Sequence, residues 1–421
     1  MSATNRTVTD YLKRLLDKQD VERLKKQLEP DFAEAALRLP RNHHLKPELI
    51  ERRWAIVAKP EAKADLLDAF ALEHSEVFAH NIENFIGTVK LPVGLAGPIR
   101  INGLFAKGDY FLPLATTEAA LVLSYHRGCN LLTAAGGATT LLLSESVSRA
   151  PGFAFENLID VGEFLRWAAP LQPKFKELAE ATTRFGKLLD MHFTVEGNHV
   201  YLRLDYLTGD AAGQNMVTIA TEAVVDYITE HCPIPIKYSF LEANLSGDKK
   251  ASSQSFMGVR GKKVSAEVVI AKDLLEKTLH TTPERMVDYW RMSSVGGILS
   301  GTIGIQGHYA NGLAALYISC GQDAACISES AVGITRFELK EDGSLYAAVT
   351  LPNLIVGTVG GGTDLPSQKA CLDIMGLAGS GHARAFAEVC AGLALAGELS
   401  IVGALCAGQF SRAHERLARD K

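Results

Sequence analysis

A glutamate, a lysine and an aspartate in this sequence would suit acid–base chemistry if the fold brought them together. Glu118 lies among small and apolar residues in ATTEAAL, at the expected start of a helix. Asp323 follows the apolar run AALYISC, which we expect to be a strand, and Lys249 belongs to the string GDKK. Burial would raise the pKa of Glu118 and let it hold a proton at neutral pH, whereas a carboxylate beside an apolar strand is costly unless it is paired. Such a cluster would titrate as a coupled unit and could stabilise negative charge on a carbonyl oxygen.

Each of these residues also has a plainer interpretation. A Gly-Asp-Lys-Lys string is typical of an exposed turn, so Lys249 and Lys250 could be solvated surface charges. Glu118 could close a capping box at the helix start. His414, in the tail SRAHERLARDK, would by itself be a surface residue. The competing histidines are His308 and His382.

The composition is that of a soluble protein with more than one domain. A chain of 421 residues exceeds what one hydrophobic core usually supports. The net charge of −5 gives no electrostatic support for a nucleic-acid partner. Seven cysteines without a CxxC pair suit reduced thiols in the cytoplasm. The opening residues are too polar for a signal peptide, and Val389 to Ala407, which carries Glu398 and three glycines, predicts a buried helix rather than a membrane span.

The elements that must position these residues predict an α+β fold with an antiparallel sheet. Residues 1–75 have a helical pattern, and VTDYLKRLLDKQDVERLKKQL is typical of an amphipathic packing or dimerisation helix. LRWAAPLQPKFKELAEAT and NMVTIATEAVVDYITEH predict helices, and FTVEGNHVYLRLDYL predicts two strands joined by a Gly-Asn turn. A last helix is expected from Ala383 to Gly408.

Changes of composition near Asn84, at Pro151-Gly152 and after Ser246 divide the chain. We expect an N-terminal helical region over 1–82 and a large mixed domain formed by 83–150 and 241–390. A smaller antiparallel-sheet domain would be inserted over 151–240, and 391–421 would form the last helix and a flexible tail. Glycine-rich Gly357–Gly362 lacks the GxGxxG spacing of a Rossmann turn, and no Walker A, HExxH or zinc-ligand cluster occurs. Any nicotinamide cofactor would therefore bind on a non-Rossmann fold, and no metal is expected.

Seven runs along the chain carry a family resemblance. They are ENFIGTVKLPVGLAGP (83–98), PLATTEAALVLSYHRGCN (113–130), GDAAGQNM (209–216), SGDKKAS (246–252), GQDAA (321–325), GTVGGGTDLP (357–366) and AGELS (396–400). Together, from about Asn81 to Arg419, the chain resembles the 3-hydroxy-3-methylglutaryl-coenzyme A (HMG-CoA) reductase family, and the eukaryotic and archaeal class more than the other bacterial class. The resemblance implies NADPH-dependent reduction of HMG-CoA to mevalonate and coenzyme A in isoprenoid biosynthesis. The alternatives are another CoA-thioester enzyme, such as a lyase or acyltransferase, or a non-catalytic homologue.

The resemblance also implies roles for individual residues. Lys249 would be the oxyanion cation, Glu118 the carboxylic acid, Asp323 the carboxylate that tunes them, and His414 the acid for the departing sulfur. The implied substrate residues are Arg149, Arg291, Asn311 and Asn244, and the implied coenzyme A residues are Ser124, His126, Arg127 and Asn130. The implied NADPH residues are Thr183, Arg184, Asp210, Gly213, Gln214, Asn215 and Met216.

Family members are homodimers with the substrate pocket at the subunit interface, so a homodimer, possibly a dimer of dimers, is implied. The run 83–98 would be the interface element. The chain departs from the family pattern at Arg291, where many members have lysine, and at Glu242, where serine is frequent, which puts the shape of that loop in doubt. Asp420 replaces a phosphorylatable serine of animal members, so we expect no phosphorylation control there.

Overall fold

The computed structural model describes residues 42–57 and 59–408, together with isolated positions between 5 and 40. The chain forms two compact units, Met1–Val89 and Lys90–Lys421, which are considered separately. The tail that carries His414 and Asp420, and most of the expected amphipathic helix near the N-terminus, lie outside the described residues. The predictions for these segments stay predictions.

The part of the first unit that the structure describes continuously is helical, as expected. It contains α3 (Pro47–Val57), α4 (Pro60–Leu66), α5 (Ala69–Glu73) and the 3-10 turn η1 (Ser75–Phe78). Arg53 of α3 is fully buried and donates hydrogen bonds to the backbone carbonyls of Asn42, His44 and Phe85. Trp54 donates to the carbonyl of Ile86. Helix α3 therefore fixes the run that begins ENFIG.

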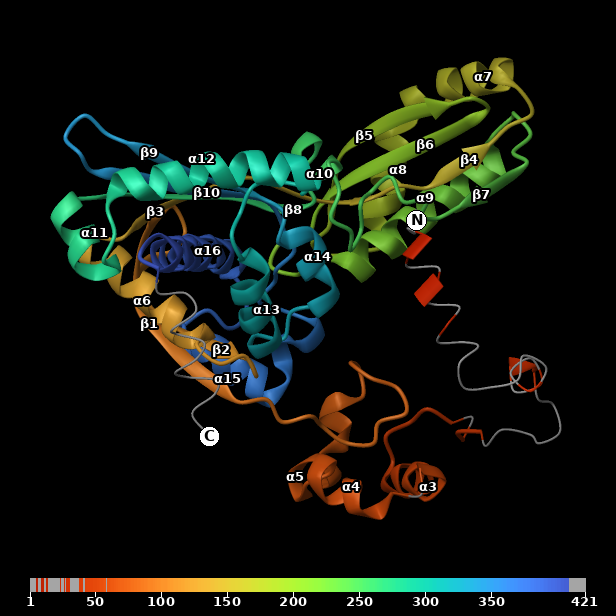
Figure 1. Cartoon of the computed structure of the whole chain (residues 1–421). Coiled ribbons are helices and arrows are strands. Elements are labelled where there is room, and N and C mark those ends of the chain that lie inside the picture. Colours follow the sequence, from red (N-terminus) through yellow and green to blue (C-terminus); the bar gives the residue numbers. More distant parts are fainter. Residues whose placement is uncertain are drawn as a thin grey trace. The chain divides into compact units, whose positions relative to one another are not determined.

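The second unit is built on one ten-stranded sheet (Figure 1). Its strands are β1 (Val93–Gly103), β2 (Lys107–Ala115), β3 (Ala138–Arg149), β4 (Gly152–Ala154), β5 (Lys187–Glu196), β6 (His199–Leu207), β7 (Tyr238–Phe240), β8 (Gly261–Ile270), β9 (Ile334–Leu339) and β10 (Leu345–Leu354). The main path is β7-β4-β6-β3-β8-β10-β9. These strands pair antiparallel, and β1 joins β3 in parallel. Strand β3 pairs with β8 along most of its length and with β6 at its end, so it joins the two halves of the sheet.

Helices cover this sheet, and those predicted over 165–182, 215–231 and 383–408 are among them. They are α6 (Leu121–Ala134), α7 (Leu158–Ala168), α8 (Gln172–Ala181), α9 (Gln214–His231), α10 (Gln254–Met257), α11 (Lys272–Leu279), α12 (Pro283–Ser300), α13 (Tyr309–Ser319), α14 (Ile327–Ser330), α15 (Pro366–Ile374) and α16 (Ala383–Cys406). The predicted hairpin is confirmed as β5 and β6 around Gly197 and Asn198. The helix predicted over 165–182 is interrupted by the 3-10 turn Ala169–Leu171, because Pro170 has no N–H to continue the helical ladder.

The prediction of a strand just before Asp323 is wrong. Residues AALYISC belong largely to helix α13, which buries Tyr309, Leu313, Leu316 and Tyr317. A short apolar run is compatible with either a strand or a buried helix, and its periodicity alone does not separate the two. Asp323 therefore follows the C-terminus of a core helix.

Helix α16 is the central core helix of the second unit, as expected for its apolar sequence. It is long and apolar enough to cross a membrane, but 83% of its apolar stretch is buried within the protein. Its buried carboxylates are satisfied: Glu388 accepts backbone N–H groups from Leu104, Phe105, Ala106 and Leu142. Glu398 accepts those of Gly307 and His308. Buried charge is tolerated when it is hydrogen-bonded in this way.

Two hydrophobic cores lie within the second unit. The larger surrounds α16 and includes residues of β1, β8, β10, α6 and α13. The smaller runs from Val147 to Ile234 and is formed by β5, β6, α7, α8 and α9. All seven cysteines are free, which agrees with the expected reduced thiols.

Candidate active site

The structure brings Lys249 and Asp323 together. The ammonium nitrogen of Lys249 lies 2.7 Å from Oδ2 of Asp323, and both side chains are partly exposed. The hydrogen bond to Asp323 raises the pKa of Lys249, so the lysine stays protonated. Asp323 is itself held, because its Oδ1 accepts the N–H of Ala325 at 2.9 Å. Lys250 instead donates to the backbone carbonyl of Asp248.

A network of arginines and carboxylates surrounds this pair. Arg149, at the end of β3, donates to Oδ2 of Asp248 at 2.8 Å and to the Thr218 hydroxyl at 2.8 Å. Arg260 donates to Oδ1 of Asp248 at 2.6 Å. Although burial raises the pKa of Asp248, the positive charges of Arg260 and Arg149 outweigh it and hold that pKa below its usual value. The network therefore pairs two buried arginines with carboxylates beside Lys249.

Glu242 shapes the loop that leads to Lys249. Its Oε2 accepts hydrogen bonds from Ser246 Oγ and from Arg149 Nη1, at 3.0 and 3.4 Å. Its Oε1 accepts the N–H of Asn244 at 2.8 Å. Asn244 itself is exposed and has a left-handed backbone, with φ of 65°. The departure seen in the sequence is thus a carboxylate that orders the loop and pairs with Arg149.

The expected cofactor residues form a second group close to the first. Thr183, between α8 and β5, donates to the sulfur of Met216 on α9, which joins two parts of the expected cofactor site. Gln214, the first residue of α9, donates to the sulfur of Cys326 at 2.6 Å. Arg184 and Asn215 are exposed. The carboxylate of Asp210 accepts the N–H groups of Gly381 and Ala383, so this aspartate anchors the loop to the start of α16.

The fold of the chain requires a glycine at position 213, independently of any ligand. Its φ of 81° is in the region that favours glycine, and an added Cβ would overlap the side chain of Thr208. Gly213 is one of the implied NADPH residues, and the contact that requires a glycine there is with Thr208 of the same chain.

Glu118 is not part of the Lys249–Asp323 cluster within one chain. It lies three residues before α6, is exposed, and its N–H donates to Thr116 Oγ1. Among the described residues, no hydrogen bond or ion pair joins it to Lys249 or Asp323. The expected burial is therefore absent in the single chain, and the capping box is also absent, since α6 starts from Ala120 without a side-chain cap.

The expected coenzyme A residues lie on α6 and contact α16. Ser124 and Arg127 both hydrogen-bond to Ser400, and Arg127 reaches both its hydroxyl and its carbonyl. His126 bonds to Asn130 through Nε2. Arg127 is thus held by the core helix rather than directed freely to solvent.

His308 and Asn311 belong to the same region as α6. His308 stacks on Tyr125 of α6, with ring centroids 5.2 Å apart, and its Nε2 contacts the carbonyl of Gly397. Asn311 lies in the first turn of α13, which begins at Tyr309. Arg291, on α12, is exposed and pairs only with Asp288 among the described residues.

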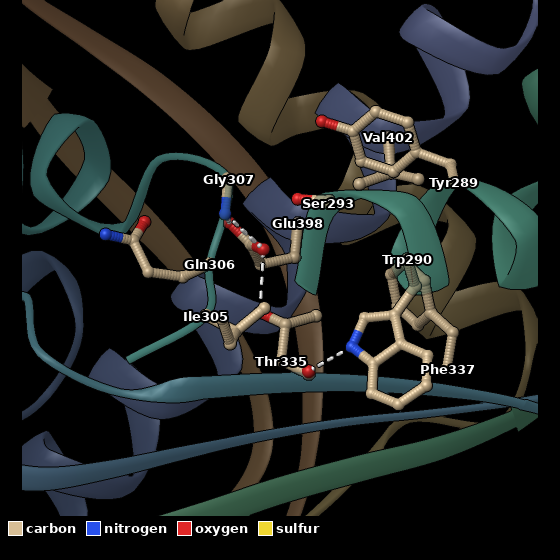
Figure 2. Close-up of a pocket in the computed structure, with 10 residues that line it drawn as sticks. All are labelled: Tyr289, Trp290, Ser293, Ile305, Gln306, Gly307, Thr335, Phe337, Glu398 and Val402. Carbon is tan, nitrogen blue, oxygen red and sulfur yellow. Dashed lines mark hydrogen bonds between the residues drawn. The ribbon is translucent and has the colours of Figure 1, made fainter. Parts of the chain in front are cut away.

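The pocket that adjoins the His308 loop is small, about 10 Å³, which leaves room for about one water molecule. Figure 2 shows the carboxylate of Glu398 in it, bonded to Gly307 and Thr335, while the indole of Trp290 donates to the carbonyl of Thr335. Pockets for cofactor-sized ligands are usually larger, about 300–1,000 Å³. This pocket is too small for a coenzyme A thioester, and residues next to His308 line it.

Sequence reasoning missed Arg260 and Glu329. Arg260 donates to both carboxylate oxygens of Glu329, and Glu329 in turn accepts the backbone N–H of Lys249. No local motif marks either residue, because they meet only through the fold.

Comparisons with known proteins identify the family. A sequence model of the hydroxymethylglutaryl-coenzyme A reductase family matches residues 48–419. The chain is 43% identical to the 3-hydroxy-3-methylglutaryl-coenzyme A reductase of Pyrococcus horikoshii, over 87% of this chain and 91% of the relative. It is 40% identical to that of Methanothermobacter thermautotrophicus, over 89% and 93%. These archaeal relatives agree with the class expected from the sequence.

A solved structure agrees in fold. The class II 3-hydroxy-3-methylglutaryl-CoA reductase of Streptococcus pneumoniae, bound to NADPH in open conformations, superposes with a TM-score of 0.64 at 21% identity, covering 84% of this chain and 96% of that one. None of these comparisons supports the alternatives of a lyase, an acyltransferase or a non-catalytic homologue. The chain belongs to the hydroxymethylglutaryl-coenzyme A reductase family.

Proposed function

We propose that this protein catalyses the NADPH-dependent reduction of HMG-CoA to mevalonate and coenzyme A. The observation that carries the proposal is the Lys249–Asp323 ion pair, at 2.7 Å, in a chain of this reductase family. Each of two reduction steps leaves negative charge on a carbonyl oxygen, and a protonated lysine beside that oxygen would stabilise it. Because Asp323 raises the pKa of Lys249, the cation persists at neutral pH.

The other proposed catalytic groups complete this chemistry. Glu118 would donate a proton to the carbonyl oxygen. His414 would protonate the departing coenzyme A thiolate, since a thiolate leaves more easily when an acid is close. Arg149, Arg291, Asn244 and Asn311 would bind the substrate carboxylate and hydroxyl. Ser124, His126, Arg127 and Asn130 would lie along coenzyme A.

NADPH would bind to the inserted domain, residues 151–240, outside a Rossmann fold. Supporting this, the domain has its own hydrophobic core, and the Thr183–Met216 contact brings the two expected cofactor segments together. The exposed guanidinium of Arg184 has no ion-pair partner among the described residues and can receive the 2′-phosphate. Bound NADPH would supply the hydrides. Gln214, at the start of α9, holds the expected cofactor loop against Cys326 beside Asp323.

The working form would be a cytoplasmic homodimer with its active site at the interface. One chain carries two separate groups of site residues, one around Lys249 and one around Glu118 and His308. An exposed apolar face on α12, formed by Met292, Val295, Ile298 and Leu299, supports a subunit contact next to Arg291. A second subunit would join the two groups into one site.

The adjacent lysines offer the test. In the full-length protein, Lys249→Met should lower kcat by about 10²–10³-fold, the usual cost of removing one oxyanion stabiliser. Lys250→Met should stay within about twofold, because among the described residues its ammonium donates only to a backbone carbonyl. The measurement is the loss of the near-ultraviolet absorbance of NADPH during reaction with HMG-CoA, and NADH and the reverse reaction are run alongside. A flat trace for the unaltered enzyme, or equal losses in the two variants, would refute the proposal.

A further inference from the structure

One short segment holds both ends of Lys249. Asp323 contacts its ammonium group at 2.7 Å, and Oε1 of Glu329 accepts its backbone N–H at 3.1 Å. Asp323 caps the 3-10 turn Ala324–Cys326, which leads directly into α14, where Glu329 lies. The backbone and the charge of Lys249 are therefore fixed by a single rigid piece of chain.

Arg260 fixes that segment to the loop before Lys249. Its Nη1 lies 2.5 and 2.6 Å from the two oxygens of Glu329, and its Nη2 lies 2.6 Å from Oδ1 of Asp248. Arg260 is 2% exposed and Glu329 is fully buried. The backbone N–H of Arg260 donates to Asn353, so the arginine is itself anchored. A planar guanidinium can bridge two carboxylates in this way, whereas an ammonium cannot hold the same fixed geometry.

The backbone of Lys249 needs such support. Its φ of 54° is in the left-handed region, which is costly for a residue with a side chain. A strained conformation persists only when its surroundings fix it. The hydrogen bond from the Lys249 N–H to Glu329 is the contact that does so directly.

We propose that Arg260 and Glu329 are positioning residues for Lys249, which they hold with its ammonium directed at Asp323. Neither contacts the substrate, and both act through the lysine. The inference rests on the proposed function, in which Lys249 is the oxyanion cation. It adds a buried arginine–glutamate pair on which the reaction rate depends.

A matched pair of variants tests this role. Glu329→Gln and Glu388→Gln each replace a fully buried carboxylate that accepts backbone N–H groups, but only Glu329 contacts Lys249. Both are measured in the full-length enzyme, below the melting temperature and per folded molecule. Glu329→Gln should lower kcat on the order of 10- to 100-fold, the scale of a small misplacement, with KM for HMG-CoA and NADPH little changed. Glu388→Gln should lower thermal stability and leave kcat unchanged.

The pH profile separates positioning from a general loss of structure. The groups facing Lys249 are Asp323, Asp248, Cys326 and Glu329. Asp323 raises the pKa of the lysine. When Glu329→Gln loosens the Lys249–Asp323 contact, that pKa falls, and the alkaline limb of kcat should move to lower pH. In Glu388→Gln the limb should not move.

The outcomes distinguish the two claims. An inactive unaltered enzyme would overturn the proposed function and this role with it. An active enzyme in which Glu329→Gln retains kcat and the alkaline limb, or in which Glu388→Gln loses kcat equally, overturns the positioning role alone. If Glu329→Gln does not fold, Arg260→Lys decides: it keeps the positive charge beside Glu329 but loses the bridge to Asp248, and should show the same fall in kcat.

Discussion

Lys249 and Lys250 are both exposed, and the difference between them is their partner. Lys249 meets a carboxylate, whereas Lys250 meets a backbone carbonyl. Composition alone would class both as surface charges, and the family resemblance selected the first. The structure supplies a physical reason for that choice, because among the described residues Lys249 pairs with a carboxylate and Lys250 does not.

Arg184 permits a prediction about cofactor choice. Arg184→Gln should raise KM for NADPH by about 10- to 100-fold and leave KM for NADH nearly unchanged, since hydrogen bonds to a charged group contribute about 1.5–3 kcal/mol. Arg166→Gln is the matched control, because Arg166 is an exposed arginine of α7 that pairs only with Glu163 among the described residues. Steady-state kinetics with both cofactors make the comparison. Equal effects on NADPH and NADH would show that Arg184 does not contact the 2′-phosphate.

Individual site residues could be predicted from the sequence only where they belong to a recognisable motif. Lys249 and Asp323 stand in recognisable runs, and the structure places them in contact. Arg260 and Glu329 are 69 positions apart and have no local signature. Their pairing arises because α14 packs against β10, the neighbour of the strand β8 that Arg260 precedes, and no short pattern encodes such a contact. The sequence also does not predict which residue Glu118 contacts. The single chain leaves the Glu118 side chain exposed.

Elements with strong periodicity were predicted well. Helix α9 buries Val217, Ala220, Val224 and Ile228, the spacing of one helical face, and alternation around Gly197-Asn198 predicted the β5–β6 hairpin. Prediction was wrong where periodicity is uninformative, in the apolar run that forms α13, and where one proline splits a helical pattern. Sheet order was not predictable, because pairings such as β3 with β8 join distant segments.

The crossing of α6 and α16 depends on Gly128. An added Cβ there would overlap the carbonyl group of Ala396, so the backbones of the two helices are in direct contact. Gly128→Ala should lower the free energy of unfolding by about 1–3 kcal/mol or more, the cost of overpacking. It should also lower activity, since Arg127 and Ser400 lie on the same two helices. Thermal or denaturant unfolding measures the first effect.

Gly162 provides the control for that prediction. It is an exposed glycine of α7, and an added Cβ would meet no atom within 4 Å. Gly162→Ala should therefore stabilise the protein by about 0.4–1 kcal/mol, because alanine is the better helix former and restricts the unfolded chain. If both alanine variants changed stability alike, close packing at the helix crossing would not be the cause.

At the scale of the whole molecule, the chain separates the parts of its proposed site. Lys249, Asp323 and Arg149 share one charged network near the cofactor segments. Glu118 precedes α6, whose Tyr125 stacks on His308. Among the described residues, no hydrogen bond or ion pair links the Lys249 network with Glu118. If Glu118 and Lys249 act on one carbonyl group, as we propose, a rearrangement or a second subunit must bring them together, and the exposed apolar face of α12 leads us to propose the second subunit.

Mixed dimers distinguish these two possibilities. Glu118→Gln and Lys249→Met should each be nearly inactive alone. In a co-expressed mixture, half the dimers would be hybrids with one intact and one doubly defective site, so about a quarter of normal activity should return. This recovery requires that Glu118 and Lys249 come from different subunits, because a site built within one chain would carry a defect in every hybrid. Two differently tagged copies of Glu118→Gln should recover nothing, and a mixture that stays inactive despite hybrid formation would place both residues in the same subunit.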